Sequence, residues 1–255
     1  MGKQLIYQVA VGEVPAFYEL CIESVADYAY RWGFKHIVQR EPQLRIKPLA
    51  SQRSVNALRL GYLPILEKEA ALAFLDSYEA ICILDADIYV TKHAENVFSG
   101  VKTDFAGVLE RDMPLTPAYL DKIRKHSEGQ FRSLTDVDWQ WNQAGAAYYN
   151  MGVMILNQSI LPYLHGQTPT EFLRRPEFAR FINGEGHWKW STDQTLLNWW
   201  VKKSGMTVTA MDWRFNALYG AVESLTGAHF VHFFLSAKQQ PGAIEKIIEG
   251  FRHHA

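Results

Sequence analysis

The sequence has few of the features that mark membrane-spanning or secreted proteins. Its 255 residues include only two cysteines, Cys21 and Cys82, and both lie inside apolar runs, which favours free thiols in a reducing compartment over a disulfide. No stretch approaches ~18 consecutive apolar residues. The apolar start of the chain ends at Gly12 and Glu13, too early for a secretory signal. We therefore expect a cytoplasmic protein without a transmembrane segment, and contact with a membrane surface stays open.

An excess of charge of one sign is also missing. The 26 Lys and Arg residues nearly balance the 27 Asp and Glu residues, which gives a formal net charge of −1. Proteins that neutralise phosphate backbones usually carry a basic excess, so we expect no nucleic-acid partner. No linker rich in Pro, Gly and Ser divides the chain, and 48% of its residues are hydrophobic, enough for a large core. We expect one domain over residues 1–255.

Apolar strand-like segments alternate with helical periodicity in the first third of the chain. Strands are expected over 5–11, 36–39 and 80–84, separated by helices over about 15–32 and 63–75. Such an alternation with short connections predicts an α/β fold with a mostly parallel sheet flanked by helices. Further strands are expected over 105–109, 148–157, 207–213 and 228–234, and further helices over 169–182, 191–203 and 241–252.

Asp85 and Asp87 stand two residues apart at the end of the apolar strand over 80–84. Ligands of open α/β sheets bind beyond the carboxyl ends of the strands, so this position favours a functional site. Two carboxylates are costly to bury unpaired. A divalent cation removes that cost, because Mg²⁺ and Mn²⁺ prefer oxygen ligands and often bridge carboxylates to a diphosphate. The pair predicts a metal–nucleotide site, with a helix cap or a solvated turn as the alternative.

Four ordered segments resemble the motifs of GT-A glycosyltransferases, in particular glycosyltransferase family 8 and the related glycogenins. They are residues 78–90 with the acidic pair, Asn150-Met151-Gly152 within 149–157, Asp193-Gln194 within 192–198, and His232 with Lys238 six residues later. The resemblance spans roughly residues 5 to 240 and implies a GT-A-type, Rossmann-like fold. It further implies a nucleotide- and metal-binding half over about 1–112 and a donor-sugar and acceptor half over about 113–255.

The resemblance also implies site residues. Asp85, Asp87 and His232 would hold Mn²⁺ or Mg²⁺, with His229 competing for the histidine position. Catalytic roles fall to Asp193, Gln194 and Lys238. Donor-binding roles fall to Lys68, Glu110, Asn150, Met151 and Gly152.

Each of these assignments has a structural alternative. Lys68 lies within the charged run 67–69 and could be a solvated helix lysine, and Asp193 could simply cap a helix. After His232 the sequence departs from the family pattern, with Leu235 in place of a glycine and Gln239-Gln240 in place of Pro-Trp. This departure weakens the case for Lys238 as a ligand of the diphosphate.

The function that follows is a metal-dependent transfer of a sugar from a nucleotide-diphosphate donor, expected to be a UDP-sugar. The acceptor would be a carbohydrate, a glycolipid or another hydroxyl compound. Family 8 implies retention of the anomeric configuration; inversion would instead need a carboxylate base, with Asp193 or Asp212 as candidates. A nucleotidyltransferase that makes nucleotide sugars and a non-catalytic carbohydrate-binding protein are the alternatives. The oligomeric state is not predicted.

Overall fold

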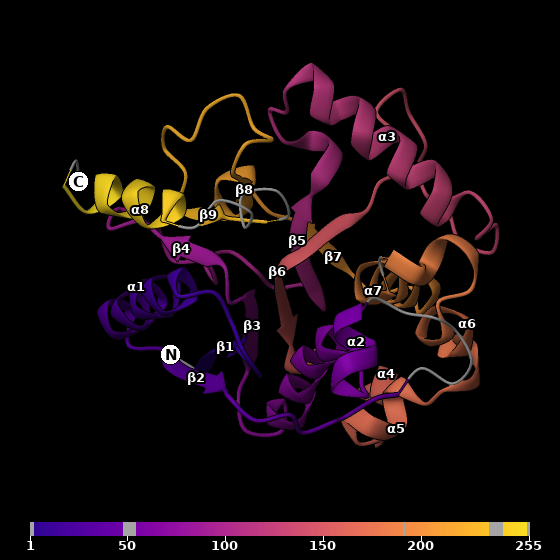
Figure 1. The fold of residues 1–255 in the computed structure, drawn as a ribbon. Helices are drawn as coiled ribbons and strands as arrows, with labels where there is room; N and C mark the ends of the chain where they lie inside the picture. The colour runs from indigo at the N-terminus through magenta and orange to yellow at the C-terminus, as the bar shows by residue number, and fades with distance from the viewer. Residues whose placement is uncertain (1–2, 48–54, 191, 235–241, 254–255) are drawn as a thin grey trace.

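A six-stranded sheet forms the centre of the fold in the computed structural model, which describes residues 3–47, 55–190, 192–234 and 242–253 (Figure 1). The strand order is β2-β1-β3-β6-β5-β7. The strands are β1 (Gln4–Val9), β2 (Lys35–Gln39), β3 (Ala80–Asp85), β5 (Phe105–Leu109), β6 (Tyr149–Asn157) and β7 (Val208–Ala210). Only β6 runs antiparallel to its neighbours β3 and β5. The expected α/β fold with a mostly parallel sheet is confirmed.

Strand β3 is central and is covered on both faces. Its residues alternate between two apolar clusters, with Ile81 and Ile83 in one and Cys82 and Leu84 in the other. This alternation follows from the two-residue period of a strand, and it explains why the segment is apolar throughout. Both cysteines are free and buried, as expected.

A second, three-stranded sheet adjoins the end of β3. It is formed by β4 (Ile88–Val90), β8 (Ala217–Leu218) and β9 (Phe230–His232), in the order β4-β9-β8. Strand β4 begins three residues after β3 ends, and its first residue, Ile88, pairs with His232 of β9. Strand β9 lies within the strand expected over 228–234. The sequence did not predict β4 and β8, because strands of three and two residues are too short to show a periodicity.

Helices cover both faces of the central sheet. Helix α1 (Phe17–Trp32) contributes to the cluster around Cys82, whereas α7 (Thr192–Lys203) contributes to the cluster around Ile81. The remaining helices are α2 (Val55–Leu60), α3 (Pro117–Phe131), α4 (Leu161–Leu164), α5 (Pro169–Leu173), α6 (Ala179–Asn183) and α8 (Ala243–His253). Within the described ranges, no helix has both the length and the hydropathy needed to cross a bilayer.

Two expected helices differ in detail. The one over 63–75 is a 3₁₀ segment, Pro64–Phe74, and not an α-helix. The one over 169–182 divides into α5, a 3₁₀ turn at Pro176–Phe178, and α6. Pro176 explains the division, because proline lacks the N–H that would continue the helix and disfavours helical geometry in the residue before it.

Candidate functional site

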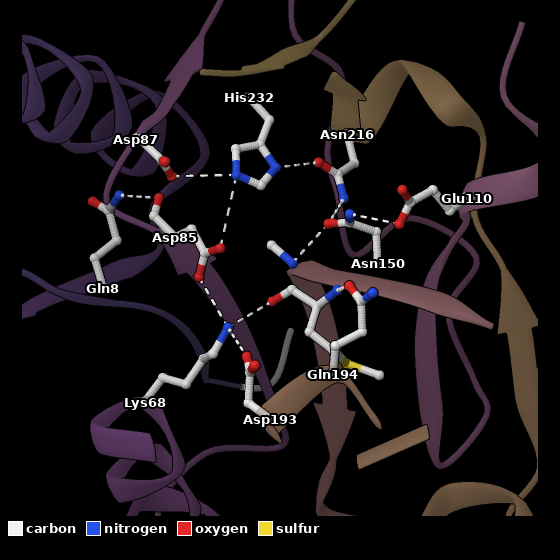
Figure 2. Close-up of polar contacts among 12 residues, drawn as sticks. Gln8, Lys68, Asp85, Asp87, Glu110, Asn150, Asp193, Gln194, Asn216 and His232 are labelled. Atoms are coloured by element: carbon white, nitrogen blue, oxygen red, sulfur yellow. Dashed lines mark hydrogen bonds and ion pairs between the residues drawn. The ribbon is translucent and has the colours of Figure 1, made fainter. Parts of the chain in front are cut away.

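The acidic pair lies where the two sheets meet. Asp85 is the last residue of β3, and Asp87 comes directly before β4. The Asp85 side chain is 34% exposed, whereas that of Asp87 is almost fully buried. Gln8 of the neighbouring strand β1 donates its side-chain amide to the Asp85 carbonyl, 3.3 Å away (Figure 2). The connection between the sheets therefore holds one carboxylate inside the protein and one at the surface of a cleft.

His232 completes a three-residue cluster with this pair. Its Nε2 lies 3.3 Å from Oδ1 of Asp87 and 3.8 Å from Oδ2 of Asp85 (Figure 2). One ligand atom from each of the three residues lies within 4.8 Å of the others, and no other such group was found among the residues with described positions. Two carboxylates and an imidazole are suitable ligands for a divalent cation such as Mn²⁺. The residues present therefore fit a metal ion.

His229, the competing histidine, lies apart from this cluster. Its buried ring contacts Phe215 and His93, and its Nε2 lies 3.8 Å from Oε1 of Glu95. Burial lowers the pKa of His229, so its imidazole is uncharged at neutral pH. By its position, His232 and not His229 is the histidine that lies beside Asp85 and Asp87.

Lys68 is buried and not a solvated helix lysine. Its ammonium group lies 2.9 Å from Oδ2 of Asp193, 3.0 Å from Oδ1 of Asp85 and 3.0 Å from the carbonyl oxygen of Met151. Burial alone would lower the pKa of Lys68, but Asp193 and Asp85 hold that pKa above its ordinary value. These three acceptors match the three N–H bonds of an ammonium group, so Lys68 ties β3, β6 and α7 together.

A second polar network lies on the other side of His232. Nδ2 of Asn150 donates to Oε2 of Glu110 at 3.0 Å, and Tyr119 donates to the other Glu110 oxygen. Burial raises the pKa of Glu110 although both neighbours stabilise its charged form. Oδ1 of Asn150 accepts hydrogen bonds from Nδ2 of Asn216 and from the backbone N–H of Gly152. Asn150 therefore keeps one N–H free of the bonds within this network.

Gly152 lies directly against the histidine ring. A Cβ atom at this position would lie 2.4 Å from Cε1 and 2.6 Å from Nδ1 of His232. The close approach that a glycine permits here is therefore to the imidazole. The donor-binding role that the family resemblance implies for Gly152 stays a prediction.

Two cavities meet at these side chains. One, of about 380 Å³, extends to α3 and is lined there by Tyr119, Lys122, Ile123 and His126. The other, of about 430 Å³, extends along the chain that follows β1. Both are lined by the same five residues, Ile65, Lys68, Asp85, Asp87 and Asp193. The acidic pair and Lys68 thus stand between two spaces, each large enough for part of a small organic ligand.

All the expected site residues that the structure describes lie together around this cleft. Gln194, near the start of α7, accepts a weak hydrogen bond from the backbone of Met151 at 3.4 Å. Lys238 lies outside the described residues. Sequence reasoning missed Asn216, Gln8 and Tyr119. None belongs to a recognisable motif, and only the folding of distant segments brings them here.

The comparisons with known proteins identify the fold. No family model matches the chain, and no curated protein matches it by sequence. A solved glycosyltransferase involved in glycosylation of the major capsid of PBCV-1 is similar in structure, with a TM-score of 0.56 and 14% identity over 96% of this chain and 99% of that one. The chain has a GT-A glycosyltransferase fold.

Two more GT-A structures have the same arrangement. The galactosyltransferase LgtC, in complex with donor and acceptor sugar analogues, matches with a TM-score of 0.50 and 12% identity over 97% of this chain and 95% of that one. Mouse xyloside xylosyltransferase 1 matches with a TM-score of 0.50 and 14% identity over 90% of this chain and 97% of that one. These likenesses establish the GT-A arrangement of sheet and helices, while the roles of single residues rest on their own geometry.

Proposed function

We propose that the protein is a metal-dependent glycosyltransferase that moves a sugar from a UDP-sugar to a carbohydrate, glycolipid or other hydroxyl acceptor. The observation that carries the proposal is the cluster of Asp85, Asp87 and His232 at the boundary between two cavities. A transferase needs such an arrangement, because the bond to be broken must lie between a site for the nucleotide and a site for the acceptor. The GT-A fold supports the same reaction class.

The charges of the site support binding of a cation. The cavity toward α3 is lined by four carboxylates and two lysines, so with all of these groups ionised its charge is 2 − 4 = −2. Asp85, Asp87 and His232 would hold Mn²⁺ or Mg²⁺, which when bound supplies positive charge to the leaving diphosphate. Lys238 would add positive charge to the same group.

The protein's own residues would orient the donor. Lys68 fixes the Asp193 and Asp85 carboxylates, so neither has to reorganise when the sugar arrives. The loop after β1 would accommodate the nucleoside, and the α3 side of the cleft would accommodate the acceptor. Gln194, Met151 and the second side-chain N–H of Asn150 would contact the sugar between them.

The environment of the remaining carboxylates supports a retaining reaction. Inversion would need a base beside the acceptor, yet Asp193 is paired with Lys68 at 2.9 Å. The carboxylate of Glu110 accepts hydrogen bonds from Asn150 and Tyr119. Asp212, the other candidate base, binds Arg214 and is not among the residues that line either cavity.

A donor screen tests the proposal directly. Nucleotide release is measured for a panel of nucleotide sugars, with and without Mn²⁺ and after chelation by EDTA. We expect release from a UDP-sugar that requires the metal, and we expect Asp87→Asn to abolish it. Asp76→Asn, an exposed aspartate outside the cleft, is the matched control and should keep wild-type turnover. A protein that binds sugars but releases no nucleotide from any donor would refute the proposed activity.

A further inference from the structure

A chain of hydrogen bonds connects the candidate metal site to the buried side chain of Glu110. It runs from Glu110 to Asn150 (3.0 Å), from Asn150 to Asn216 (2.9 Å), and from Asn216 to Nδ1 of His232 (3.0 Å) (Figure 2). All four side chains are at most 8% exposed, and Asn216 is fully buried. Water therefore cannot easily replace any of these bonds, and each partner depends on the next.

The backbone fixes the direction of this chain. The N–H of Gly152 can only donate, and it lies 3.0 Å from one end of the Asn150 amide, which must be the oxygen. That oxygen also accepts from Asn216, so the amide nitrogen of Asn216 faces Asn150. At the far end, the carboxylate of Glu110 accepts from the Asn150 nitrogen, which requires the same orientation.

This direction determines the proton on His232. Because the nitrogen of Asn216 faces Asn150, its oxygen faces Nδ1 of His232 and can only accept a hydrogen bond. Nδ1 must therefore carry the proton, and in the neutral ring the lone pair is on Nε2. That atom points at the carboxylates of Asp87 and Asp85, 3.3 and 3.8 Å away.

We propose that Asn216 is a positioning residue that holds His232 in its Nδ1–H tautomer, with the Nε2 lone pair preset to bind a divalent cation between Asp85 and Asp87. The inference rests on the proposed metal site for its purpose but not for its geometry. A lone pair facing two carboxylates is unfavourable in a buried site until a cation lies between them. Partners that orient a metal-binding histidine in this way fix both its tautomer and its ring position.

Nitrogen NMR of the metal-free protein tests the tautomer without any activity assay. The protein is labelled with ¹⁵N in its histidine rings, and its spectrum is recorded at a pH at which the imidazoles are neutral. We expect His232 as the Nδ1–H tautomer in the unchanged protein. Asn216→Asp should preserve it, because a carboxylate also accepts from Nδ1, and Asn216→Leu should lose it. An Nε2–H tautomer in the unchanged protein would overturn the proposal whether or not the variants fold.

Binding of Mn²⁺ alone, followed by electron paramagnetic resonance of the free ion, gives the second readout. We expect Asn216→Leu to weaken Mn²⁺ binding by about ten- to hundredfold. Asn157→Leu is the matched control. Asn157 lies at the end of β6 away from Asn150, and its side-chain amide donates to the Thr103 carbonyl. This variant should bind Mn²⁺ as the unchanged protein does. Equal Mn²⁺ affinity of Asn216→Leu and the unchanged protein would overturn the role of Asn216. If the unchanged protein shows the Nδ1–H tautomer but binds no Mn²⁺, the proposed metal-dependent function fails and the tautomer assignment is supported.

Discussion

Replacing Gly152 with alanine adds a single methyl group against the ring of His232. The new Cβ would lie 2.4 Å from Cε1, whereas carbon atoms in contact prefer about 3.5–4.0 Å, so the ring would have to move by roughly 1 Å. The ring is buried and bonded to Asn216, so overpacking should destabilise the protein by about 1–3 kcal/mol. For a domain of this size, that lowers the melting temperature by about 2–12 °C. Mn²⁺ affinity should fall as well, because ligand distances tolerate only about 0.2 Å.

Thermal melts and Mn²⁺ titration of the purified variant check both effects. Gly250→Ala is the matched control, since Gly250 lies in α8 and a Cβ there would meet no atom within 4 Å. This control should keep wild-type Mn²⁺ binding and gain about 0.5–1 kcal/mol of stability, because alanine is a better helix former than glycine. If Gly152→Ala melts and binds Mn²⁺ like the unchanged protein, the ring is not held against Gly152, and our account of the site is wrong.

Three further outcomes are expected. Lys68→Met leaves Asp193 buried without its partner, so urea unfolding should show that the free energy of unfolding falls by about 3–5 kcal/mol. The double variant Lys68→Met, Asp193→Asn should recover part of this loss. Equal losses in the single and the double variant would contradict the ion pair. Burial lowers the pKa of His36 from 6.5 to about 4. Between these two pH values the unfolded chain therefore binds a proton at His36 that the native protein does not. The free energy of unfolding should therefore fall between pH 6.5 and about 4, and His36→Gln should reduce this dependence; an unchanged pH profile would refute the assignment. UDP and Mn²⁺ together should raise the melting temperature by more than the sum of their separate shifts, because each binds the native state beside the other; additive or absent shifts would argue against a shared site.

Local patterns predicted much of the fold. The run Ile81-Cys82-Ile83-Leu84 is apolar because both faces of β3 are covered, and this property is readable without a structure. The predicted strand over 148–157 is confirmed as β6, but its reversed direction was not predicted, because strand direction depends on how the chain returns to the sheet. The helix expected over 169–182 was wrong in its continuity, since the effect of Pro176 outweighed the apolar periodicity.

The candidate site was likewise predicted from the sequence only in part. Motif resemblance brought together Asp85, Asp87 and His232, and the structure places their ligand atoms within 4.8 Å of one another. Asn216 carries no motif, so no sequence pattern could have predicted its bond to His232. The contacts of Lys68 were equally unreadable from the sequence, because a lysine between two glutamates resembles a solvated surface residue until its burial is known.

By itself, the sequence determined where strands end in polar motifs and which residues are candidates for the site, because hydrophobic periodicity and the order of polar motifs are local properties of the chain. Only the tertiary structure decided which of these side chains touch and which of their atoms face one another. The pairing of Ile88 with His232 joins segments more than a hundred residues apart, and the orientation of the Asn150 amide follows from one backbone N–H. Hydrogen-bond direction and burial belong to the folded arrangement, and at this site they fix the chemistry of His232.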